Sequence, residues 1–171
     1  MAMPKKPYRF DQSEYWDKSF TELDVSQQTL ERIEFEACTF TGCNFTETQL
    51  KQCRFIDCEF IHCNLTVVKL VGSQFLNVSF EECKIVGVNW GNANWSSLAL
   101  SAPLKFYQCM INDSSFYGLQ LAEIVIENCR AINVDFREGD FNHANFSYSD
   151  LSASLFHNTN LSGADFSNAE N

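Results

Sequence analysis

Large apolar residues recur every five positions along most of this chain. In the stretch 38–65 a Phe or Leu fills each frame position, and a small residue, usually Cys, stands two positions earlier. The frame residues of this stretch are Phe40, Phe45, Leu50, Phe55, Phe60 and Leu65. A helix needs apolar residues three and four apart and a strand needs them two apart, so a period of five fits neither element alone.

The frame runs from Phe20 to Leu100, slips by one residue, and continues from Phe106 to Phe166. All sixteen phenylalanines lie on it once Phe10 is included. A period this strict indicates a stacked repeat architecture. We therefore expect a lead and cap at 1–19, then one repeat domain at 20–168 with halves at 20–100 and 106–168, and a short C-terminal end at 169–171.

Residues i and i−2 of each pentapeptide are apolar or small, and the other three are mostly polar. Burying the first two gives one short extended side and a corner, so four sides close a square coil of twenty residues. About thirty pentapeptides would then make seven to eight coils, stacked at the strand spacing of ~4.8 Å. Large residues twenty apart should form inner columns, and the slip should place Trp95 between Phe75 and Phe116. Aromatic residues of the cap, including Trp16, should cover the first coil.

The slip contains Pro103 and comes after two frame tryptophans. An extra residue there could form a functional bulge. The alternative, a structural irregularity between two halves of one solenoid, is the favoured interpretation.

Acidic residues outnumber basic residues by 22 to 12, which gives a formal net charge of −10. Such a balance disfavours direct binding to nucleic acid or to an anionic membrane and favours a basic protein partner. The N-terminus lacks the apolar core of a secretory signal, and no apolar run is long enough to span a bilayer. The sequence therefore predicts a soluble, cytoplasmic protein.

Eight cysteines lie two residues before frame positions, where they should act as small core fillers. Thiols twenty residues apart would stack at the coil spacing, so a disulfide or a metal site remains an alternative. A thiolate metal site needs converging ligands rather than a parallel ladder, which favours the filler interpretation. The eight are Cys38, Cys43, Cys53, Cys58, Cys63, Cys83, Cys109 and Cys129.

Catalytic chemistry finds no support in the sequence. His62, His143 and His157 occupy outward positions, where a solvated histidine is the better interpretation than a ligand or a base. Glycine-rich phosphate loops, zinc-protease motifs and nucleophile elbows are all missing from the sequence. We expect no enzymatic activity, no cofactor and no metal.

The late repeats carry a family resemblance, in Ala144-Asn145-Phe146, Ala164-Asp165-Phe166 and Ser149-Asp150-Leu151. Over residues 20–168 the chain resembles pentapeptide-repeat proteins, which implies an all-β fold, the right-handed quadrilateral β-helix. The Cys-rich first half and the break after it resemble the Qnr-type quinolone-resistance proteins and the microcin immunity protein.

That resemblance implies a DNA-mimicking protein that binds DNA gyrase or a related type II topoisomerase and protects it from quinolones or a peptide toxin. It also implies a homodimer, which those relatives build with a C-terminal helical extension. This sequence stops at Asn171, so the chain is either naturally short or missing a tail. Relatives often carry projecting loops as well, and here we expect no insertion longer than one residue.

Outward acids on two neighbouring sides should form an acidic edge along the rod. The side of Phe60 and Phe80 also carries Glu22, and the side of Leu30 and Leu50 should instead be basic. The edge could imitate a phosphate strand, or it could simply keep the solenoid soluble. In the second case the protein is a non-catalytic interaction scaffold. The partner-binding candidates are Glu34, Glu36, Asp57, Glu59, Glu81, Glu82, Glu123, Asp135, Glu138 and Asp140.

Overall fold

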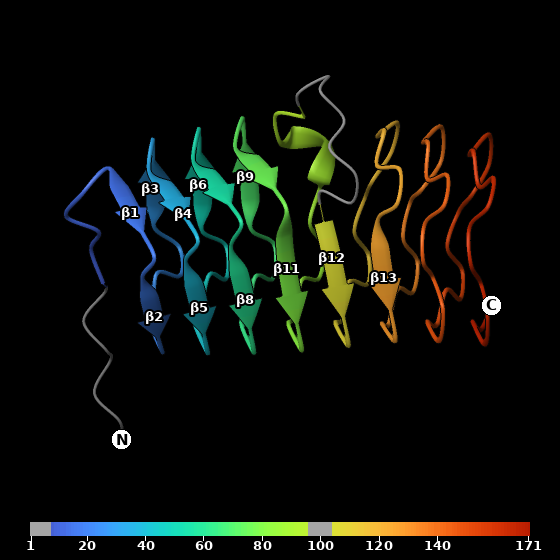
Figure 1. Cartoon of the computed structure of the whole chain (residues 1–171), viewed down its shortest axis with the longest axis horizontal. Helices are drawn as coiled ribbons and strands as arrows, with labels where there is room; N and C mark the ends of the chain where they lie inside the picture. Colours follow the sequence, from blue (N-terminus) through green and yellow to red (C-terminus); the bar gives the residue numbers. More distant parts are fainter. Residues whose placement is uncertain (1–7, 96–103) are drawn as a thin grey trace.

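A computed structural model describes residues 8–95 and 104–171 of the chain. The chain winds into a rod of stacked coils, with β1 (Glu14–Trp16) near one end of the rod and the C-terminus at the other (Figure 1). Every pair of neighbouring strands is parallel and joins residues one coil apart. The predicted all-β parallel solenoid is therefore confirmed.

Three ladders of short strands run along the rod (Figure 1). The first comprises β1 (Glu14–Trp16), β4 (Glu34–Glu36), β7 (Arg54–Ile56) and β10 (Gln74–Leu76). The second comprises β2 (Ser19–Thr21), β5 (Thr39–Thr41), β8 (Glu59–Ile61), β11 (Val78–Glu81), β12 (Leu104–Tyr107) and β13 (Val125–Glu127). The third comprises β3 (Thr29–Glu31), β6 (Gln49–Lys51) and β9 (Lys69–Val71). The helical segment η1 (Trp90–Asn92) is a single 3-10 turn.

The rod has four sides, which we number in chain order. Face 1 carries the ladder of β1 and resumes after β12 through the bridges Gln120–Asp140–Asn160. Face 2 carries the ladder of β2 and continues through Asn145 to Asp165. Face 3 consists of isolated bridges from Asp24 to Glu170, and face 4 carries the ladder of β3 and continues from Asn89 to Leu155.

Regular strands cover fewer coils than we expected. The six strands of face 2 span five coils, and isolated bridges carry the same column two steps further, through Asn145 to Asp165. The strands are short because each side of the coil has room for only one inward residue between two outward ones. The burial patterns of β3 and β8, with a buried centre between two accessible residues, show this directly.

The corners of the coil are made by the residue two places after a frame centre, which adopts a left-handed backbone at every described corner except Asn92 of η1. Asp57, Glu82 and Gln108, for example, have φ angles of 51°, 49° and 53°. This conformation strains most residues and suits glycine. At Gly163, with φ at 71°, a Cβ atom would also lie 2.5 Å from the Nδ1 atom of His143, so a larger residue there would have to displace the imidazole ring.

The interior is filled by stacked aromatic rings. Phe55 stacks on Phe35 and Phe75 with ring centroids 5.1 and 5.3 Å apart. At the N-terminal end Phe10 packs edge-on against Tyr15 and Phe35, so an aromatic ring covers the first coil. Trp16 takes no part in it, because its position next to Tyr15 in β1 points outward and leaves it 68% exposed.

The break between the two halves is larger than a one-residue slip. Phe80 pairs with Phe106, and Lys84 with Met110, so partners across the break are 26 residues apart instead of 20. Six residues are one pentapeptide plus one, which is why the frame of five shifts by only one. The additional residues lie between Trp95 and β12, a segment that includes Pro103 and falls outside the described residues.

This insertion corrects the predicted column. Trp90, not Trp95, stacks on Phe116, with ring centroids 5.7 Å apart. Trp95 lies beside Phe75 at 6.4 Å, and its indole N–H donates to the Trp90 carbonyl at 2.9 Å. Every described residue after the insertion therefore lies one face earlier, in the chain order of the faces, than the sequence suggested.

Candidate partner-binding surface

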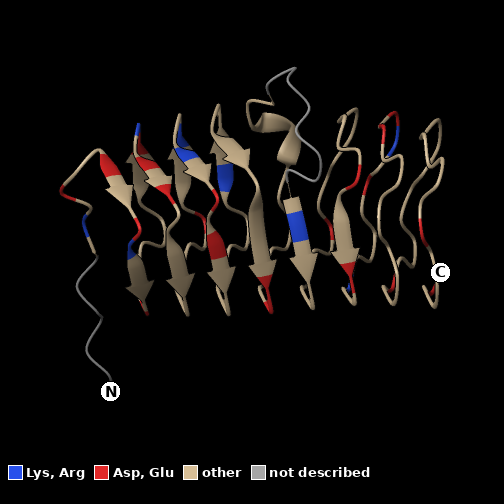
Figure 2. Ribbon diagram, in the orientation of Figure 1, with Lys and Arg blue, Asp and Glu red and all other residues tan. Residues whose placement is uncertain are grey.

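The excess of acidic residues lies mainly on two adjoining sides of the rod. Faces 1 and 2, taken with the corner after each, carry 13 acidic and 3 basic residues. That balance of −10 equals the net charge of the whole chain, because the remaining residues comprise 9 acids and 9 bases. Acidic positions recur from β1 to the last coils of the rod (Figure 2). We call this area the acidic surface.

Eight of the ten predicted residues lie on the acidic surface. They are Glu34, Glu36, Asp57, Glu59, Glu81, Glu82, Glu123 and Asp140. Glu123 and Asp140 lie on face 1 of this surface, although the sequence predicted them on face 2. Asp140 bridges to Gln120 and Asn160 in the face 1 column.

Asp135 and Glu138 stand elsewhere, and their predicted location was wrong. Asp135 bridges to Ser115 and Leu155, which places both residues on or beside face 4. Because the break contains six additional residues rather than one, these two residues fall one face earlier than predicted and lie off the acidic surface. Arg137 also neutralises Asp135 through two hydrogen bonds, of 2.9 and 2.8 Å, and this pairing lowers the pKa of Asp135.

Four acids of the surface were missed by the sequence argument. Glu127 and Asp165 were assigned to another side because the insertion was taken as one residue. Glu14 and Asp17 were placed in a cap, although β1 already pairs with β4 in the face 1 ladder. The tyrosine at position 15, five residues before Phe20, was the available signal. The predicted basic side, face 4, is mixed, because Glu31, Asp135 and Glu138 also stand on it.

Polar side chains one coil away hold several of these carboxylates in place. The amide of Asn77 donates to Asp57 at 2.6 Å, and the amide of Asn160 donates to Asp140 at 2.9 Å. Arg54, one of the three bases on the surface, is engaged by Glu34 at 2.6 Å. The carboxylates are thus presented in fixed positions at intervals set by the coil.

Face 2 also exposes apolar groups between its acids. Ile61 of β8, Tyr107 of β12 and Val125 of β13 point outward and are half-buried. Ile61 and Tyr107 alternate along the ladder with Glu81 and Glu127, and Val125 pairs with Lys105 in the neighbouring column. The surface therefore offers van der Waals contact as well as charge.

The thiols lie inside the rod and are shielded from solvent. All eight cysteines are buried and unpaired. Burial raises the pKa of Cys58 from its ordinary 9.0 to about 12. In the described residues no three metal-ligating side chains converge, and no described helix is long and apolar enough to cross a membrane.

Comparison with known proteins agrees with this architecture. The model of the pentapeptide repeat region matches residues 33–103 and 97–166, so the chain belongs to the pentapeptide-repeat family. Two trypsin-treated variants of QnrB1, a plasmid-mediated fluoroquinolone resistance protein, have a similar structure. One is 21% identical with a TM-score of 0.60, and the alignment covers 92% of this chain and 76% of that chain. The other is 18% identical with a TM-score of 0.61, over 89% and 84%. No curated protein sequence matches the chain.

Proposed function

We propose that this protein mimics the charge of DNA, binds a type II topoisomerase such as DNA gyrase, and protects it from quinolones or a peptide toxin. The observation that carries the proposal is the concentration of acidic residues, 13 against 3 basic ones, on two adjoining faces of a rod. Coils repeat at ~4.8 Å and phosphates along one DNA strand at about 3.4 Å, so the carboxylates form a comparable row of charge. The resemblance of the sequence to quinolone-resistance proteins supports the choice of partner.

The role is proposed to be non-catalytic. The interior is filled by stacked rings, which leaves no place for a substrate inside the described part of the rod. A basic enzyme surface that normally holds duplex DNA would instead bind the acidic surface, and DNA would compete with it. Screening by salt should weaken such binding strongly.

One experiment tests this function directly. Purified gyrase is assayed for supercoiling with and without a fluoroquinolone while the protein is titrated. We expect the protein to shift the inhibition by the drug, and to compete with duplex DNA for gyrase. Unchanged supercoiling and unchanged drug inhibition over a wide range of concentrations would contradict the proposal.

Two quadruple variants with the same change in net charge locate the effect. The first replaces Glu59, Glu81, Glu82 and Asp140 by Gln or Asn on the acidic surface. The control replaces Glu31, Glu47, Asp113 and Glu138 in the same way on the other faces. All eight side chains are accessible, so folding should survive in both. We expect the first variant to lose the effect on gyrase and the control to retain it.

A non-catalytic interaction scaffold with another partner is the second candidate. Ile61, Tyr107 and Val125 on face 2 favour it, because a phosphate backbone has no apolar counterpart. A scaffold of this kind would bind its partner without competition from DNA. Its binding would also persist at salt concentrations that release a charge mimic.

A further inference from the structure

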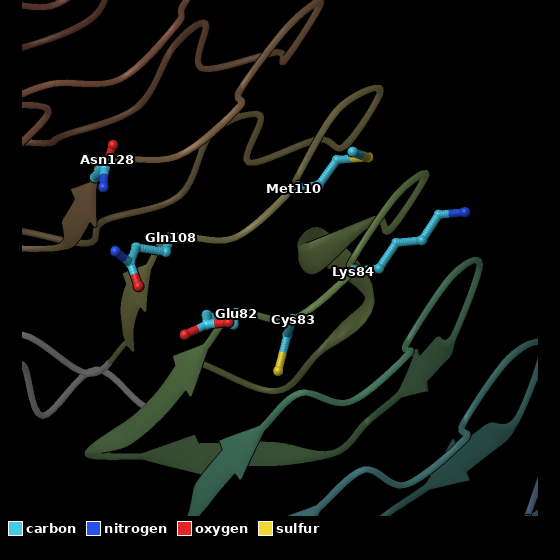
Figure 3. Close-up of a pocket in the computed structure, with 6 residues that line it drawn as sticks. All are labelled: Glu82, Cys83, Lys84, Gln108, Met110 and Asn128. Carbon is cyan, nitrogen blue, oxygen red and sulfur yellow. The ribbon is translucent and has the colours of Figure 1, made fainter.

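A shallow groove of about 540 Å³ runs along the corner between faces 2 and 3. Three successive coils line it, with Glu82, Gln108 and Asn128 at the corner and Lys84 and Met110 on face 3 (Figure 3). The corner residues come directly after β11, β12 and β13. The groove therefore forms one margin of the acidic surface.

Two amide side chains in this groove have no hydrogen-bond partner among the described residues. Gln108 and Asn128 are exposed and make no side-chain hydrogen bond to any residue of 8–95 or 104–171. Some other corner amides are engaged, as where Asn133 donates to Asp113 and Asn158 donates to Glu138. A side-chain amide offers both a donor and an acceptor, which is the complement of a peptide group. Gln108 and Asn128 can therefore pair with a peptide backbone.

Charge around the groove selects the side chains of an occupant. Glu82 stands at the corner with His62 3.3 Å from its carboxylate, and Glu81 and Glu127 stand on the adjoining face 2. Lys84 and Met110 extend away from the corner on the other side (Figure 3). The ammonium group of Lys84 therefore does not neutralise the negative charge at the corner. A lysine or arginine side chain would find complementary charge over the face 2 side.

We propose that this groove binds an extended polypeptide segment that carries lysine or arginine side chains. The backbone of the segment would exchange hydrogen bonds with the amides of Gln108 and Asn128, and its cationic side chains would lie over Glu81, Glu82 and Glu127. The proposal deepens the proposed function and rests on its assignment of the acidic surface as the contact area. It adds recognition of a peptide backbone, which charge mimicry alone does not supply.

The test uses the full chain and fluorescent peptides, without any topoisomerase. The probe is a nine-residue peptide of alternating lysine and serine, and its match is the same peptide with N-methylated backbone amides. Both carry the same charge, and only the first can donate backbone hydrogen bonds. Fluorescence anisotropy at low salt should show the unmethylated peptide binding about tenfold more tightly, because each hydrogen bond lost reduces affinity several-fold.

The variant Gln108→Gly with Asn128→Gly removes both amides and keeps a residue that accepts the left-handed backbone of these corners, where φ is 53° and 52°. We expect it to abolish the difference between the two peptides. Gln27→Gly, at a corner with φ at 58° between faces 3 and 4, is the matched control and should preserve the difference. Equal binding of both peptides to the unaltered protein, or a difference that survives in the double variant, would overturn the proposal. Because gyrase is absent from the measurement, failure of the supercoiling test and failure of the groove can be told apart.

Discussion

Small residues on the inner side of the coil accept a hydrogen bond from the backbone of the coil before. The backbone N–H of Cys43 donates to the Sγ atom of Cys63 at 3.4 Å, and that thiol donates to the Phe40 carbonyl at 3.3 Å. In the same column the N–H of Cys129 donates to the Oγ atom of Ser149 at 3.0 Å. Cysteine and serine therefore do the same task here, and each satisfies a buried N–H group that would otherwise be costly.

Replacing one thiol tests this role. Cys63→Ser should change the free energy of unfolding by less than about 1 kcal/mol, because the hydroxyl can accept and donate in the same directions. Cys63→Val fills similar space and leaves the N–H of Cys43 unpaired, so it should destabilise by about 1–3 kcal/mol. Chemical denaturation of both variants measures the difference. An equal loss in the two would mean that the thiol acts only by its volume.

The thiols also predict a response to alkaline pH. Because the pKa of Cys58 is about 12 in the folded protein and 9.0 ordinarily, the unfolded chain releases this proton first as pH rises. The unfolding free energy should then fall between about pH 9 and 12, by up to about 1.4 kcal/mol per pH unit for such a thiol. Denaturation at pH 8, 9.5 and 10.5 checks the trend, and a Cys58→Ser variant should reduce it. Stability that is constant over this range would contradict the burial argument.

At the scale of elements, the sequence predicted which residues point inward, but it did not predict the face of every residue after the insertion. The frame from Phe20 onward correctly identified the inward residues, such as Phe55 and Phe136, because one inward centre per pentapeptide is a property of the repeat. The face of a residue depends on its position within twenty, not within five. An insertion of one residue and an insertion of six leave the same frame of five, so Asp135 and Glu138 could not be placed from periodicity alone.

The tryptophans beside the insertion test the observed register. Trp90 is 1% exposed and packs between Phe75, Phe106 and Phe116, so Trp90→Ala should cost about 3–5 kcal/mol. Trp95 is partly buried against Phe75 and Trp90, and Trp95→Ala should cost clearly less. Urea denaturation compares the two variants. A larger loss for Trp95→Ala would favour the column that the sequence suggested.

At the scale of the whole molecule, charge and shape act together. Thirteen carboxylates on two faces repel one another through the stack, while faces 3 and 4 together carry eight carboxylates and six basic groups. Hydrogen bonds such as those to Asp57 and Asp140 fix individual groups but do not cancel the total. The arrangement destabilises the fold by electrostatic self-repulsion, and it produces a negative electrostatic potential over faces 1 and 2.

Salt should therefore stabilise the fold in the absence of any partner. Between about 0.02 and 0.5 M NaCl the Debye length shortens several-fold, which screens repulsion across the acidic surface. We expect the melting temperature to rise over this range, and to rise less in the quadruple variant that neutralises Glu59, Glu81, Glu82 and Asp140. The control quadruple variant on the other faces should respond as the unaltered protein does. A melting temperature that falls with added NaCl would show that attractive pairs dominate instead.

The parallel pairing of coils twenty residues apart has a consequence for the size of this surface. A duplicated block of twenty residues, such as 44–63, would continue every column without turning the rod, and would lengthen it by one strand spacing, about 4.8 Å. The natural insertion also leaves the later coils in their columns, because Phe106 pairs directly with Phe80 across it. The length of the acidic surface can therefore change only by whole coils, and the coil is the smallest unit by which the protein could match the length of a partner.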